Sequence, residues 1–114
     1  MNIREISDIV EGTILSGDNI INDEVTTAFA SDLMSEVLTI DTHSLLLVTG
    51  LANIQTIRTA EMSEIKNILF VRNKKPTAEM IELAKDEGIN LIVSNKSMFL
   101  ICGLLYNAGL KPVY

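Results

Sequence analysis

The sequence predicts an α/β protein, a small three-layer sandwich in which helices cover both faces of a mostly parallel sheet. Three short apolar runs lead to this prediction, and they lie at residues 45–48, 67–71 and 91–93. Each run is nearly continuous in apolar residues, which is typical of parallel strands buried on both faces. A turn and then a segment with helical spacing of apolar residues follow each run. The C-terminal two-thirds of the chain therefore predicts three successive strand–helix units.

Length, composition and charge exclude several classes of protein. The chain has 114 residues, of which 47% are hydrophobic, so we expect residues 1–114 to form a single domain with a real core. The net charge is −6, and an acidic surface repels nucleic acid. The apolar runs are too short to span a membrane. With no visible export signal and a lone cysteine, the cytoplasm is the expected location.

The N-terminal third predicts a helix and a strand that form a lid on these units. Apolar residues at helical spacing predict a helix over residues 2–11, and Gly12 is in the usual place of a residue that ends a helix. A short strand is expected at residues 13–15. Turn-forming residues then predict a loop over residues 18–24 with little regular structure.

A further strand and helix are expected before the first of the three units. Residues 25–30 predict a strand with Val25, Thr27 and Phe29 on one face. Apolar residues at 33, 34, 37 and 38 then predict a helix. Either Ser31 or Asp32 can cap it, because a short side-chain oxygen can accept from the free amides of the first turn.

The ends of the three later helices carry recognisable signals. Asn53 and Thr77 are expected to cap the first two helices, and Gly88 and Gly109 to follow the ends of the last two. The inward faces are predicted from apolar spacing. They comprise Ile54, Ile57 and Ala60, then Met80, Ile81 and Ala84, and finally Met98, Ile101, Cys102 and Leu105. The methionines at 34, 62, 80 and 98 are predicted to belong to the core.

Polar residues follow the predicted strands at the edge where ligands bind in open parallel sheets. Each of these segments leads into a helix N-terminus, whose free amides favour an anion. We therefore predict a site for a small phosphate or nucleotide, formed by Thr49, Gly50, Asn53, Arg72, Lys74, Ser94 and Ser97. The alternative interpretation is that the Ser, Thr and Asn residues are ordinary helix caps and that the cations are solvated loop charges.

No catalytic set is visible in the sequence. The chain contains no P-loop and no GxGxxG motif. His43, close to Asp41, is the one candidate for a general base, and no nucleophile accompanies it. One cysteine and one histidine cannot form a structural zinc site, and Cys102 on an apolar stripe is expected to be a buried structural thiol. We predict no metal, no cofactor and no enzymatic activity.

Several separated blocks of the sequence resemble the DRTGG domain family, and they occur in the same order as in that family. They are SDLMSEVL at 31–38, LLLVTGLANIQTIRTAEM at 45–62, ILFVRNKKP at 68–76 and SMFLICGLLYNAGL at 97–110. DRTGG domains occur beside CBS domains in regulated pyrophosphatases and inside bacterial phosphotransacetylases. The resemblance implies a compact α/β sandwich with a regulatory or assembly role, and CBS-linked members use the domain to form a dimer.

The chain departs from the motif for which the family is named. The family has an Asp-Arg pair after the central strand, where this sequence has Gly50-Leu51-Ala52. It has Thr-Gly-Gly after the next strand, where this sequence has Val71-Arg72-Asn73. Arg72 is a candidate to replace the missing cation from a different strand. The pair Leu51-Ala52 is predicted to be exposed at the turn, where it would suit a protein contact.

These observations lead to three functional hypotheses. The first is a non-catalytic regulatory or scaffolding module that forms a homodimer, with sensing of a small anionic metabolite at the strand ends. The second is a sensor of a nucleotide or phosphorylated metabolite that acts on a separate partner enzyme. The third is a small enzyme that uses His43. Neither nucleic acid nor a membrane is an expected partner.

Overall fold

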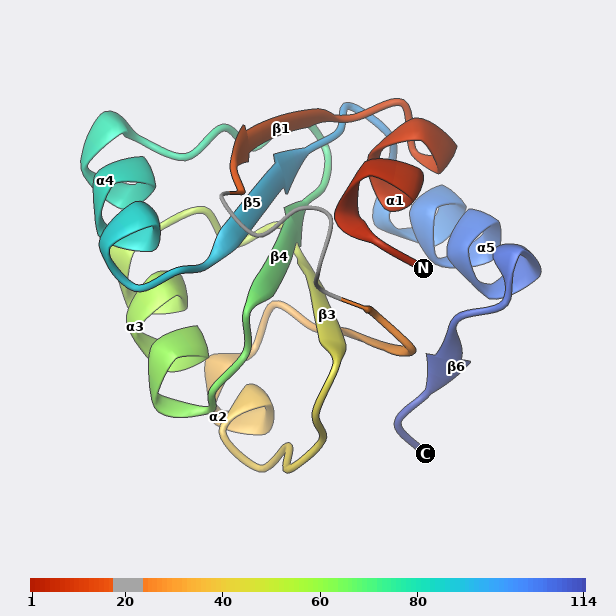
Figure 1. Ribbon diagram of the computed structural model, residues 1–114, viewed down its shortest axis with the longest axis horizontal. Coiled ribbons are helices and arrows are strands. Elements are labelled where there is room, and N and C mark those ends of the chain that lie inside the picture. Colours follow the sequence, from red (N-terminus) through yellow and green to blue (C-terminus); the bar gives the residue numbers. More distant parts are fainter. Residues whose placement is uncertain (18–23) are drawn as a thin grey trace.

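The centre of the protein is a mixed sheet, seen in a computed structural model that describes residues 1–17 and 24–114 (Figure 1). The strands of this sheet have the order β1-β5-β4-β3-β2-β6. All neighbours in the sheet are parallel except β1 and β5, which are antiparallel. The strands are β1 (Thr13–Ser16), β2 (Thr27–Ala30), β3 (Leu45–Thr49), β4 (Asn67–Phe70), β5 (Asn90–Val93) and β6 (Lys111–Pro112). The predicted mostly parallel sheet is confirmed.

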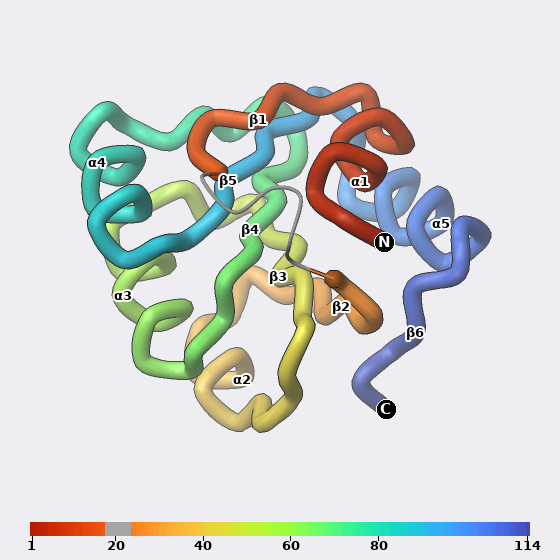
Figure 2. Tube along the Cα trace, viewed as in Figure 1, coloured from red at the N-terminus to blue at the C-terminus, as the bar shows by residue number. Residues whose placement is uncertain are grey.

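Helices cover both faces of the sheet, which confirms the predicted three-layer sandwich. The helices are α1 (Ile3–Ile9), α2 (Met34–Val37), α3 (Ile54–Met62), α4 (Ala78–Asp86) and α5 (Met98–Ala108). One face packs against α2, α3 and α4, and the other packs against α1 and α5. The tube in Figure 2 shows these two groups of helices on opposite sides of the strands.

Alternation along the buried strands divides the core between the two layers. Leu45 and Leu47 of β3 belong to the core beneath α2, α3 and α4. Leu46 and Val48 belong to the core beneath α1 and α5. Successive side chains of a strand point to opposite faces, so a strand covered on both sides needs an apolar residue at every position. This explains the continuous apolar runs of the sequence.

The predicted N-terminal helix and strand are part of the sandwich. Helix α1 packs beside α5, and β1 extends the sheet next to β5 (Figure 1). The prediction that Gly12 ends α1 was wrong. The helix ends at Ile9, and Glu11 is the residue that takes a positive φ, of 52°. Gly12 instead lies against β5, where a Cβ atom would be 3.0 Å from the Val93 carbonyl oxygen.

The segment between β1 and β3 differs in detail from the prediction. Strand β2 begins at Thr27, two residues later than predicted. Val25 therefore belongs to the core on the α1 side, whereas Phe29 packs against the core on the α2 side, and the two do not share a face. Helix α2 is a single turn that begins after Leu33, without a side-chain cap. Of the predicted loop over residues 18–24, only Glu24 lies within the described part of the chain.

The helix caps and the later core are close to the prediction. Asn53 and Thr77 accept hydrogen bonds from the first turns of α3 and α4, and Gly109 follows α5 with a φ of 111°. One predicted core residue was wrong, because Met62 at the end of α3 is 74% exposed. Within the described residues, no helix is both long enough and apolar enough to cross a membrane.

Strand β6, which contains Pro112, was not predicted from the sequence. The strand pairs with β2 through Thr27 and Ala28 and forms the far edge of the sheet. An edge strand tolerates proline because the missing N–H would have faced solvent. The pairing covers only two residues, so Phe29 and Ala30, the second half of β2, have no partner in β6.

Candidate functional site

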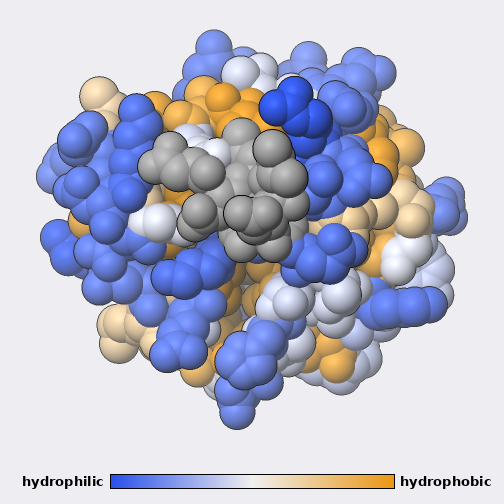
Figure 3. Space-filling view, in the orientation of Figure 1, coloured by the Kyte–Doolittle hydropathy of each residue, from blue (hydrophilic) through white to orange (hydrophobic). Residues whose placement is uncertain are grey.

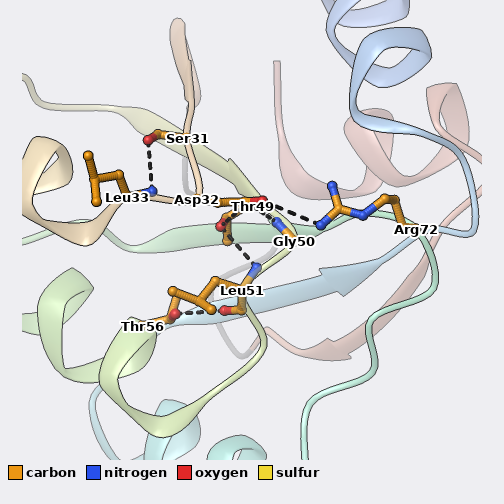
Figure 4. Close-up of polar contacts among 8 residues, drawn as sticks. All are labelled: Ser31, Asp32, Leu33, Thr49, Gly50, Leu51, Thr56 and Arg72. Atoms are coloured by element: carbon orange, nitrogen blue, oxygen red, sulfur yellow. Dashed lines mark hydrogen bonds and ion pairs between the residues drawn. The ribbon is translucent and has the colours of Figure 1, made fainter.

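The carboxyl ends of β2, β3 and β4 lie side by side, and the Asp32 carboxylate connects the loops that follow them (Figure 4). Asp32 follows β2. Its Oδ1 accepts from the backbone N–H of Gly50 at 2.6 Å and from the Thr49 hydroxyl at 3.0 Å, both at the end of β3. Its Oδ2 lies 3.4 Å from Nη2 of Arg72, which follows β4. We call Asp32, Thr49, Gly50 and Arg72 the rim cluster.

The rim cluster favours an ionised carboxylate. The hydrogen bond from the Gly50 N–H is the main cause that lowers the pKa of Asp32 below its ordinary value of 3.8, and Thr49 and Arg72 add to it. Partial burial opposes this effect. The side chains of Asp32 and Arg72 are 47% and 43% exposed. An ion pair with this exposure and this single contact contributes little to stability.

The turn between β3 and α3 is held by hydroxyl groups. The Thr49 oxygen that donates to Asp32 also accepts from the Leu51 N–H at 3.1 Å. The Thr56 hydroxyl donates to the Leu51 carbonyl at 2.6 Å, and Asn53 accepts from the Thr56 N–H at 3.0 Å. Leu51 and Ala52 were predicted to be exposed. They are half-buried against the core beneath α3 because this turn folds back onto it.

The loop after β4 has an unusual backbone that positions Arg72. Arg72 and Asn73 take positive φ angles of 57° and 56°, which are uncommon for residues other than glycine. The Arg72 N–H donates to the Lys96 carbonyl at 2.9 Å, and the Asn73 N–H donates to the Ser94 carbonyl at 2.8 Å. These two hydrogen bonds connect this loop to the loop after β5. The Arg72 guanidinium then lies over Gly50, where a Cβ atom would be 2.0 Å from Nη2.

Three of the seven predicted site residues lie together in the rim cluster, namely Thr49, Gly50 and Arg72. Thr49 is fully buried, so its hydroxyl serves the cluster itself. Gly50 contributes its N–H group to Asp32. Of the three, Arg72 offers an exposed charged group to solvent.

The other four predicted site residues have different roles. Asn53 and Ser97 cap α3 and α5, as the alternative interpretation of the sequence stated. Ser94 is buried, and its hydroxyl donates to the Val10 carbonyl at 2.8 Å. Lys74 is exposed on the loop after β4.

Sequence reasoning missed the central role of Asp32. The sequence placed this residue directly before a predicted helix, and it was therefore interpreted as a possible cap. In the structure Leu33 occupies the N-cap position of α2, and the Ser31 hydroxyl accepts from the Leu33 N–H. The available signal was the position of Asp32 just beyond a parallel strand, at the same edge as Thr49 and Arg72.

The other candidates for chemistry lie away from the rim cluster. His43 is exposed and precedes β3, so it lies at the amino end of this strand, whereas the rim cluster lies at the carboxyl ends. Cys102 is half-buried on α5, and desolvation raises the pKa of its thiol. In the part of the chain that the structure describes, no group of three or more His, Cys, Asp or Glu residues could hold a metal ion.

Comparisons with known proteins bear on the fold. No protein-family model matches the chain, and no curated protein matches it in sequence. A solved structure does match, with a TM-score of 0.78 and 17% sequence identity. It is the crystal structure of the CBS and DRTGG domains of the regulatory region of Clostridium perfringens pyrophosphatase, complexed with the activator diadenosine tetraphosphate.

The chain has a DRTGG-like fold. The match covers 98% of this chain and 48% of the pyrophosphatase chain, so this protein spans about half the length of that regulatory region. The predicted resemblance to DRTGG domains is thereby supported at the level of fold.

The structure shows what this chain has at the two places where its sequence departs from the DRTGG motif. The family's two glycines correspond to Arg72 and Asn73, and these are the residues with positive φ, a conformation that glycine adopts without steric cost. The acidic–basic pair missing beside Gly50 is present in space, because Asp32 and Arg72 approach Gly50 from the two neighbouring strands.

Proposed function

We propose that this DRTGG-like chain is a regulatory module of the cytoplasm, without catalytic activity of its own, which forms a homodimer and acts on a separate enzyme. The observation that carries the proposal is the match of 98% of the chain to the regulatory region of a pyrophosphatase. The position of His43 also supports it, because this exposed histidine precedes β3 and lies away from the rim cluster.

The ligand that fits the rim cluster best is a small anionic metabolite with a phosphate group, such as a nucleotide. Arg72 presents a half-exposed guanidinium at the carboxyl ends of the strands, where α/β proteins bind ligands. Its contact with Asp32 is single and long, at 3.4 Å. A phosphate can offer Arg72 two shorter, charge-assisted hydrogen bonds. The activator in the matching structure is a dinucleotide, which supports this class of ligand.

In this proposal Asp32 competes with the ligand for Arg72. The ionised carboxylate occupies the guanidinium and adds a negative charge next to the phosphate position. Binding therefore requires Arg72 to leave Asp32, and that movement changes the contacts between the loops after β2 and β4. The charge of Asp32 therefore lowers the affinity for the ligand. The module then has two states, one with Arg72 paired to Asp32 and one with Arg72 bound to the ligand.

Calorimetry with purified protein tests the sensor role against adenine nucleotides, diadenosine tetraphosphate and acyl phosphates. We expect saturable binding that Arg72→Ala abolishes. Asp32→Asn should bind about 5- to 10-fold more tightly, because it removes the competing charge but keeps an acceptor for the Gly50 N–H. Lys85→Ala is the matched control, since this cation lies in the last turn of α4. It should bind like the unaltered protein.

Two outcomes would argue against parts of this proposal. If neither the unaltered protein nor Asp32→Asn binds any of these compounds, the sensor role is wrong and the module is a scaffold. The observation that favours a scaffold is that Thr49, Ser94, Asn53 and Ser97 already satisfy internal hydrogen bonds. If purified protein turns over a substrate and His43→Ala loses that turnover, the non-catalytic assignment is wrong.

A further inference from the structure

Helix α5 exposes large apolar side chains along its outer face. Phe99 is 89% exposed and Tyr106 is 68% exposed. The two lie seven residues apart, so they occupy the same side of the helix. Gly103 lies between them on that side. Apart from its chain neighbours and the nearby backbone of α5, no described heavy atom is within 4 Å of the position that a Cβ atom would take. On this face of α5, two exposed aromatic side chains are therefore separated by a position without a side chain.

A hollow of about 130 Å³ opens next to this face, between α5 and the edge of the sheet. Its walls include Ala28 and Ala30 of β2, Cys102 and Tyr106 of α5, and Pro112 of β6. A cavity of about 150 Å³ in another protein accommodates benzene. The hollow therefore has about the size of one aromatic ring, and its walls are mostly apolar.

We propose that α5 forms the homodimer interface, and that Phe99 of each copy enters the hollow of the other. This inference rests on the proposed homodimer and assigns its surface. In an antiparallel pair of α5 helices that cross near Gly103, position 99 of one copy lies opposite positions 106 and 107 of the other. Tyr106 lines the hollow, so this register brings the Phe99 ring to its mouth.

Self-complementarity makes a second copy the occupant. A two-fold contact uses the same surface on both partners, and this surface carries both the projecting ring and the hollow that fits it. Antiparallel helices also place the positive end of one helix dipole beside the negative end of the other. A partner of different sequence would have to reproduce both features.

Charge supports the same assignment. The chain has a net charge of −6, so two copies repel each other over most of their surfaces. Helix α5 is MFLICGLLYNA and contains no charged residue. In Figure 3, hydrophobic surface in orange appears on the right flank, which is the side where Figure 1 shows α5. Two copies that meet through α5 avoid like-charge contact at the centre of the interface.

The two aromatic side chains supply more than half of the area that a small interface needs. Phe99 and Tyr106 can together bury about 300 Å² per copy, given their exposed fractions and the area of aromatic side chains. A biological interface needs roughly 500 Å² per copy. Leu100, which is 45% exposed, and the walls of the hollow supply further apolar area. The aromatic side chains would be the hot spots of this contact.

Sedimentation equilibrium of the full chain at micromolar concentration tests the assignment. We expect a dimer, and we expect Phe99→Ala to raise its dissociation constant about 30-fold or more, as for a central aromatic hot spot.

Gly103→Glu should make the chain monomeric, since two carboxylates would meet at the crossing. A mid-helix glycine with open space around it can be replaced without unfolding the helix, and a thermal melt by circular dichroism checks this. The matched control is Met62→Glu, which alters a 74% exposed apolar residue on α3 and should leave the dimer intact.

A disulfide tests the antiparallel register directly. In a Cys102→Ala background, Gly103→Cys should form a covalent dimer under mild oxidation, because the two copies cross at this residue. Met62→Cys in the same background should not. If the unaltered chain is a monomer at micromolar concentration, both the homodimer and its interface are wrong. If the chain is a dimer that neither Phe99→Ala nor Gly103→Glu weakens, the homodimer stands and the α5 interface is wrong.

Discussion

At the scale of single residues, Asp32 has the largest influence on the candidate site. One carboxylate accepts from Thr49 and Gly50 at the end of β3 and pairs with Arg72 after β4. It thereby joins the ends of three neighbouring strands. Glycine at position 50 leaves the space that the Arg72 guanidinium occupies, and a side chain there would displace the guanidinium. The rim cluster is therefore a structural connection and the proposed ligand site at once.

The lowered pKa of Asp32 predicts a pH dependence of stability. The pKa is lower in the folded chain than its ordinary value of 3.8, mainly through the Gly50 N–H. The stabilisation is therefore fully present above about pH 4 and disappears as the pH falls through the folded-state pKa. Between about pH 4 and pH 2, we expect the free energy of unfolding to fall less for Asp32→Asn than for the unaltered chain. Urea titrations across this range measure it, and identical acid profiles would contradict the prediction.

At the scale of elements, the loop after β4 shows how local backbone strain positions the site. Arg72 and Asn73 take positive φ because their N–H groups reach the carbonyls after β5. Each such residue other than glycine carries a steric cost of roughly 1 kcal/mol, which asparagine tolerates best. The two loops together position the guanidinium over Gly50.

Substitution of Asn73 tests this account. Asn73→Ala should lower the free energy of unfolding by about 1 kcal/mol, because alanine fits a positive φ less well than asparagine. Asn73→Gly should be at least as stable as the unaltered chain. Lys74→Ala, an exposed change in the same loop, should have an effect below about 0.5 kcal/mol. Guanidinium unfolding at neutral pH measures all three, and an alanine variant as stable as the glycine variant would show that no strain resides there.

At the scale of the whole molecule, the two faces of the sheet are covered unequally. Helices α2, α3 and α4 cover one face, whereas α1 and α5 cover the other. The hollow beside β2 lies on the face with two helices. Strand β6 covers this edge for only two residues. In the proposed dimer, Phe99 of the second copy would fill the hollow at this edge.

This arrangement predicts a stability that depends on protein concentration. If only the folded chain dimerises, mass action raises its melting temperature as concentration rises. We expect the unaltered chain to melt several degrees higher after a hundredfold increase in concentration. Gly103→Glu should melt at one temperature throughout. Differential scanning calorimetry measures both, and a concentration-independent melt of the unaltered chain would contradict a folding-linked dimer.

Local signals in the sequence were enough to predict the layers of the fold. The continuous apolar runs at residues 45–48, 67–71 and 91–93 correspond to β3, β4 and β5, because strands covered on both sides need apolar residues throughout. Caps such as Asn53 and Thr77 were predictable because their partners lie three residues away. Thr49, Gly50 and Arg72 could also be predicted as neighbours, since the carboxyl ends of parallel strands share one edge.

Contacts between distant residues determined the rest, and sequence spacing does not encode them. Asp32 lies 40 residues from Arg72, and its choice of Gly50 over the first turn of α2 depends on how β2 and β3 align. The same holds for β6, whose two residues become a strand only because β2 is beside them. Leu51 and Ala52 are half-buried because the turn that carries them folds onto the core. Each of these outcomes depends on packing between segments of the folded chain, whereas caps and apolar periodicity depend on residues close together in the sequence.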